Sequence, residues 1–74
     1  MKVETQDFYF SVYLHLNGIP IDEIKDYGSR KMFVFEDNEL YQKLKRAYYW
    51  NQATVDPLEY KKGIRELKGL MMNT

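Results

Sequence analysis

The chain of 74 residues contains no cysteine and only one histidine, His15. Without cysteine there are no disulfide bonds and no thiolate metal sites, and a single histidine excludes multi-histidine metal sites and paired catalytic histidines. Glycine occurs four times and proline twice, and the glycines are too scattered to form a phosphate-binding loop. These absences predict a protein without a metal, a cofactor or a catalytic residue, which acts by contact rather than by enzymatic chemistry.

Long apolar runs are also missing. The apolar stretch MFVF at 32–35 is far shorter than the ~20 residues that a membrane-spanning helix needs. The opening MKVETQDFYF does not have the apolar core of a signal peptide. We therefore expect a cytoplasmic protein without a membrane partner and without a small-molecule substrate. Because the chain is small and lacks disulfides, self-association is one of the few ways left to add stability.

The formal net charge is zero, but the two signs are unevenly placed. Residues 1–39 carry four basic and eight acidic side chains, and residues 40–74 carry seven basic and three acidic ones. Such asymmetry indicates either a basic binding face or two halves that attract each other on folding. The absence of a net positive charge favours the second interpretation.

The first predicted helix runs from Phe8 to about Asn17, with Asp7 as its N-cap and Gly18 as its C-terminal stop. This helix is apolar nearly all round. Phe10 and Leu14 lie on a different face from the stripe at positions 8, 12 and 16. A helix of this kind is buried on two sides or is covered on one side by another molecule. Phe10 and Leu14 are therefore either core residues or a contact surface.

A hairpin and two helices follow. An extended segment around Ile24, a turn at Gly28 and the apolar run at 31–35 predict an antiparallel β-hairpin. Asp37 or Asn38 can cap a second helix that ends near residue 50. At 56–59, an aspartate cap, a proline in the first helical position and a glutamate typical of a capping box predict a third helix to about residue 71. The sequence thus predicts an α+β fold of one helix, an antiparallel β-hairpin and two C-terminal helices, in a single domain of residues 1–74 with an ordered core of about 7–71.

Three aromatic residues, Tyr48, Tyr49 and Trp50, stand in a row at the end of the second helix. Successive helical residues turn by about 100°, so Tyr48 falls on the core face while Tyr49 and Trp50 fall in the polar sector. The alternative is that the helix unwinds at residue 49 and the chain folds one ring back under the loop at 51–55. If the rings stay outside, they form with Phe10 and Leu14 a protein contact surface with Lys45 and Arg46 on its rim, because exposed aromatic residues beside basic ones are typical of interaction hot spots.

Basic residues of the third helix indicate a second kind of partner. Its basic side chains are Lys61, Lys62, Arg65 and Lys68. A basic helix that follows a turn offers cations to nucleic-acid phosphates, although these residue types also form ordinary solvated helix faces. The predicted third helix contains no asparagine or glutamine that could read bases.

The chain from residue 7 to about residue 71 resembles a small domain family of unknown function found in bacteriophage, bacterial and archaeal genomes. The matching features are Asp7, the apolar helix that ends at Gly18, FVFED at 33–37, Tyr48, VDP at 55–57 and LK at 67–68. The resemblance implies a stand-alone small protein of a mobile element, located in the host cytoplasm if it is phage-encoded. It supplies no functional residue.

Together these features predict a non-enzymatic interaction protein, an accessory or host-modulating factor of phage type that binds a protein partner or a second copy of itself. The alternative is a small nucleic-acid-binding module that uses the basic face of the C-terminal helix.

Overall fold

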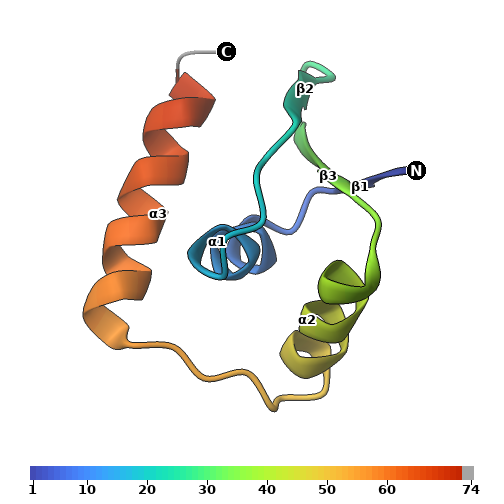
Figure 1. Ribbon diagram of the computed structural model, residues 1–74. Coiled ribbons are helices and arrows are strands. Elements are labelled where there is room, and N and C mark those ends of the chain that lie inside the picture. The colour runs from blue at the N-terminus through green and yellow to red at the C-terminus, as the bar shows by residue number, and fades with distance from the viewer. Residues whose placement is uncertain (73–74) are drawn as a thin grey trace.

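The computed structural model describes residues 1–72, with the elements β1 (Lys2–Thr5), α1 (Phe8–Leu16), β2 (Glu23–Asp26), β3 (Lys31–Glu36), α2 (Glu39–Tyr49) and α3 (Pro57–Met72). The expected α+β class is confirmed. Figure 1 shows α1 in the middle of the molecule, with α3 along one side of it and α2 on the other. The last two residues of the expected domain, 73–74, lie outside the described residues.

The sheet contains one strand more than the sequence predicts. β2 and β3 form the expected antiparallel hairpin, in which Ile24 lies opposite Phe33. β1 pairs antiparallel with the other side of β3, with Val3 opposite Phe35, and gives the strand order β1-β3-β2. The apolar run that was expected to be a strand is therefore the central one, and the ordered part of the chain begins before residue 7.

The core lies between the sheet and α1. Phe33 and Phe35 alternate along β3 and are 1% and 0% exposed, so both point from the same face of the sheet toward the helices. The ring of Phe33 lies 6.1 Å from that of Phe8 on α1. On the opposite side of α1, Leu67 of α3 is fully buried. Helix α1 thus contacts both the sheet and α3, which explains why it is apolar nearly all round.

The N-caps form as local sequence chemistry requires. Asp7 Oδ1 accepts the backbone N–H of Phe10 at 3.0 Å, and Asp56 Oδ1 accepts the N–H of Leu58 at 2.8 Å. Each cap satisfies a backbone donor that has no partner within its own helix.

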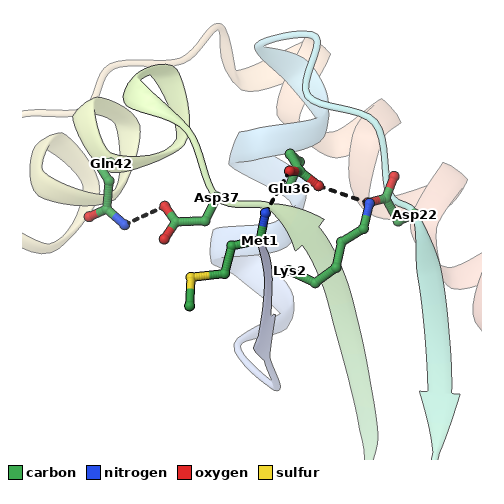
Figure 2. Close-up of polar contacts among 6 residues, drawn as sticks. All are labelled: Met1, Lys2, Asp22, Glu36, Asp37 and Gln42. Carbon is green, nitrogen blue, oxygen red and sulfur yellow. Dashed lines mark hydrogen bonds and ion pairs between the residues drawn. The ribbon is translucent and has the colours of Figure 1, made fainter.

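The structure shows which of the two expected residues caps α2. Asn38 is the N-cap, because its Oδ1 accepts the N–H of Tyr41 at 2.8 Å. Asp37 instead accepts a hydrogen bond of 2.7 Å from Gln42 Nε2, as Figure 2 shows. This side-chain bond ties the turn before α2 to the first turns of the helix.

Gly18 ends α1 in the left-handed conformation, with φ of 83°. Its N–H donates to His15 O at 3.1 Å, and the N–H of Ile19 donates to Leu14 O at 3.1 Å. These two bonds define a Schellman motif, and Ile19 and Leu14, the residues of its usual apolar contact, both belong to the buried core cluster. The predicted stop at Gly18 is confirmed.

Ion pairs cover one end of the sheet (Figure 2). The Lys2 ammonium binds the carboxylates of Asp22 and Glu36, and its distance to Glu36 is 2.9 Å. The N-terminal amino group of Met1 lies 2.9 Å from the same Glu36 carboxylate. These pairs join β1 to β3 and to the residue before β2, so three separate segments are tied at one point.

A second ion pair crosses the central strand. Lys25 of β2 lies 3.1 Å from the Glu4 carboxylate of β1, although β3 separates the two strands. Between them Val34 points away from the core face, yet it is only 3% exposed. The stems of charged side chains often cover apolar surface in this way, and we infer that the Lys25–Glu4 pair shields Val34.

Removing the Glu36 carboxylate is expected to flatten the acid dependence of stability. The hydrogen bonds from Lys2 and from the terminal amino group lower the pKa of Glu36 from 4.5 to about 2. A carboxyl group with a lowered folded-state pKa stabilises the fold above its unfolded pKa and loses that contribution as the pH falls toward the folded value. Thermal melts from pH 5 to pH 2 should therefore show a difference between wild type and Glu36→Gln that vanishes near pH 2.

The control for this pH series is Glu23→Gln. It removes an exposed carboxylate that makes no ion pair within residues 1–72. A Glu23→Gln protein that shows the same flattening as Glu36→Gln would contradict the assignment to the Lys2 network.

Candidate functional site

Phe10 and Leu14 do not belong to any surface. They are 1% and 0% exposed, so their assignment to the contact surface is wrong. The side of α1 that carries Phe10 is covered by aromatic rings of α2, with ring centroids 5.9 Å from Tyr41 and 5.2 Å from Tyr48. Phe10 and Leu14 are core residues, which is the other of the two possibilities that the sequence left open.

Trp50 is exposed, with 68% of its surface accessible. Helix α2 continues to Tyr49, and Trp50 is its C-cap. Asn51 then takes the left-handed conformation with φ of 61°, and the N–H of Gln52 donates to Ala47 O at 2.8 Å. This second Schellman motif ends the helix without unwinding it, so the alternative in which the indole folds under the following loop is wrong.

Tyr49 is half-exposed, and its hydroxyl is held in place. It donates a hydrogen bond of 2.7 Å to Asp7 Oδ2, while the other carboxylate oxygen of Asp7 caps α1. Burial and this hydrogen bond raise the pKa of Tyr49 above its ordinary value. One carboxylate thus joins the start of α1 to the end of α2 and fixes the direction of the Tyr49 ring.

Of the two expected rim residues, Arg46 is the one that the helix places between the rings. On a helical projection Arg46 lies about 60° from Tyr49 and about 40° from Trp50, whereas Lys45 lies about 140° from Trp50. Both basic side chains are exposed and have no acidic partner within residues 1–72. We call Arg46, Tyr49 and Trp50 the aromatic surface, with Lys45 at its edge.

The basic residues of α3 lie on a separate part of the molecule. They are Lys61, Lys62, Arg65 and Lys68, all of them exposed. α3 packs against the side of α1 that α2 leaves free (Figure 1). The two sets of candidate contacts that the sequence predicts therefore do not form one site.

The sequence did not predict a hollow of about 400 Å³ between α1, the end of α2 and the start of α3. Its lining includes the tyrosines Tyr13, Tyr48 and Tyr60. Burial raises the pKa of Tyr48, and it raises that of Tyr60 to about 12, while the Tyr60 hydroxyl donates to the backbone oxygen of Tyr9 at 3.0 Å. Because three separate elements form this hollow, no local sequence pattern identifies it.

Two further findings concern metals and membranes. Within residues 1–72, no group of three or more acidic or histidine side chains is arranged to hold a metal ion. None of the described helices has the length and apolar character required to span a bilayer.

Fold and surface together define a small α+β domain with an exposed aromatic helix end. The chain belongs to the family DUF5659, a domain of unknown function, whose model matches residues 2–73. No curated protein and no solved structure matches the chain significantly.

Proposed function

We propose that this chain is a small, non-enzymatic interaction protein that binds another protein through the aromatic surface of Arg46, Tyr49 and Trp50. The observation that carries the proposal is the 68% exposure of Trp50 at an ordered helix end. Trp, Tyr and Arg are the residues most enriched among binding hot spots, and the aromatic surface consists of one of each. The setting that we propose is a phage-type accessory or host-modulating role, on the strength of the resemblance described above.

Preorganisation supports the same proposal. The backbone at Trp50 is fixed by the Schellman motif at Asn51, and the Tyr49 ring is fixed by Asp7. Binding therefore has less ordering to do in the Trp50 backbone and the Tyr49 ring, and ordering costs of this kind are among the main penalties of association. An aromatic side chain needed only for folding would gain more stability in the core, because burial of its apolar area is what stabilises.

The test uses Trp50 both as a probe and as a variant. Trp50 is the only tryptophan of the chain, so its fluorescence reports directly on the aromatic surface. A photo-crosslinking residue at position 45, at the edge of the aromatic surface, captures the partner, which is identified by mass spectrometry and then purified. Titration with this partner should shift the Trp50 emission to shorter wavelength, and Trp50→Ala should weaken binding at least about tenfold, or about 1.4 kcal/mol, by calorimetry.

Tyr27→Ala is the matched control. Tyr27 is 51% exposed but belongs to the turn between β2 and β3 and not to α2. Its substitution should leave the affinity for the partner unchanged. If Trp50→Ala binds as wild type does, the aromatic surface is not the contact. If the captured partner is a second copy, light scattering must show a dimer that Trp50→Ala dissociates.

A further inference from the structure

The basic side chains of α3 differ from those of the sheet in their ion pairing among the described residues. Each lysine on the strands is ion-paired, as in the pairs Lys2–Glu36, Lys25–Glu4 and Lys31–Asp26. None of the four basic side chains of α3 has an acidic partner within residues 1–72. The sheet thus neutralises its own cations, whereas α3 leaves its cations available to a ligand.

Three of these side chains form one line, which we call the basic stripe: Lys61, Arg65 and Lys68. Their spacing of four and three residues places them within about 60° of one another on the helix, with rises of about 6 Å and about 4.5 Å between them. Together with Ile64, Gly69 and Met72 they line a shallow hollow of about 450 Å³. Lys62 lies about 100° from Lys61, at the edge of this line.

The acidic residues of α3 point elsewhere. Glu66 faces α1, where its Oε1 lies 3.2 Å from His15 Nε2. Glu59 lines a different hollow, together with Leu16 and Asn17. Neither of these α3 carboxylates therefore lines the hollow of the basic stripe, even though the whole chain has no net charge.

We propose that the basic stripe binds the phosphate backbone of a nucleic acid. Its composition distinguishes it from the aromatic surface, because lysine is depleted at protein–protein interfaces but is a common ligand of phosphate. The arginine adds a planar donor fork that matches phosphate geometry. Since α3 contains neither asparagine nor glutamine, it lacks the side chains that read adenine, and we assign the stripe to phosphate contacts. This inference goes beyond the proposed protein contact and uses the opposite side of α1.

The salt dependence of binding tests the proposal. Fluorescence anisotropy of a short labelled DNA duplex is measured with the full chain at about 50 and about 200 mM salt. Three phosphate contacts predict that the dissociation constant rises about 40-fold over this range, since each neutralised phosphate adds about 0.9 to the logarithmic slope. Arg65→Gln should weaken binding and reduce this rise to about 12-fold, because one contact is lost. A duplex of unrelated sequence should bind equally well.

The control is Lys25→Gln, which removes the same charge from the sheet and should retain the wild-type salt dependence. The proposal fails if the duplex does not bind at the lower salt concentration, or if Lys25→Gln and Arg65→Gln have equal effects. It also fails if polyglutamate displaces the duplex as effectively as unlabelled DNA does, because the stripe would then be a site for an acidic protein. Circular dichroism of both variants shows that any loss is not caused by unfolding.

Discussion

Replacing Phe10 by alanine is expected to lower the free energy of unfolding by about 3–5 kcal/mol. The Phe10 side chain is 1% exposed, and its ring lies 5.2 Å from the rings of both Tyr48 and Tyr49. Alanine would leave a cavity at the contact between α1 and α2, and it would also remove ring pairs that stabilise beyond their buried area. A domain of 74 residues has a total stability of roughly 4–11 kcal/mol, so this loss leaves the fold marginal.

Urea unfolding followed by circular dichroism measures the loss. If Phe10→Ala does not fold, Phe10→Leu is measured in its place. Its loss in the free energy of unfolding should be smaller, because leucine keeps most of the side-chain volume. Tyr9→Ala is the control on the same helix, since Tyr9 is 54% exposed and should change stability by less than about 1 kcal/mol. Equal losses for Phe10→Ala and Tyr9→Ala would contradict the core position of Phe10.

Replacing Gly63 by leucine is expected to cost about 1–3 kcal/mol. A Cβ atom at position 63 would lie 3.0 Å from Val12 Cγ1 and 3.1 Å from Leu16 Cδ2. Val12 is fully buried and, as a β-branched residue, has little rotamer freedom in a helix. A larger side chain therefore has to push α3 away from α1, and this strain exceeds the gain of up to about 1 kcal/mol in helix propensity.

Gly69 provides the matched control in the same helix. A Cβ atom there meets nothing within 4 Å, so Gly69→Ala should raise the free energy of unfolding by about 0.5–1 kcal/mol through helix propensity alone. Gly63→Ala should gain less than Gly69→Ala in the same denaturant series. Equal gains at the two positions would show that α1 and α3 do not approach closely at Gly63.

The helix boundaries were predictable because local chemistry determines them. An aspartate before Phe8, a glycine after the first helix and the Asp-Pro pair before α3 each satisfy or terminate backbone hydrogen bonding within a few residues. The end of α2 was harder to predict, because Asn51 takes the role that glycine usually has. The angular argument for Tyr49 and Trp50 succeeded because this Schellman motif keeps the helix regular to Tyr49.

Strand β1 could not be predicted from its own residues. The segment KVET holds one strongly apolar residue, Val3, and it becomes a strand only by pairing with β3 about 30 residues later. The same limit applies to Phe10 and Leu14. A helix that is apolar on several faces indicates that several neighbours exist, but only the packing of α2 and of the sheet identifies them. The tyrosine-lined hollow also depends on three distant segments meeting.

The strand order makes β1 and β2 the two edge strands of a narrow sheet. Edge strands can pair with strands of other molecules, and charged side chains on them discourage such pairing. Glu4 on β1 and Lys25 on β2 supply charges of this kind. Acid conditions protonate Glu4 but leave Lys25 charged, so they remove only part of this protection.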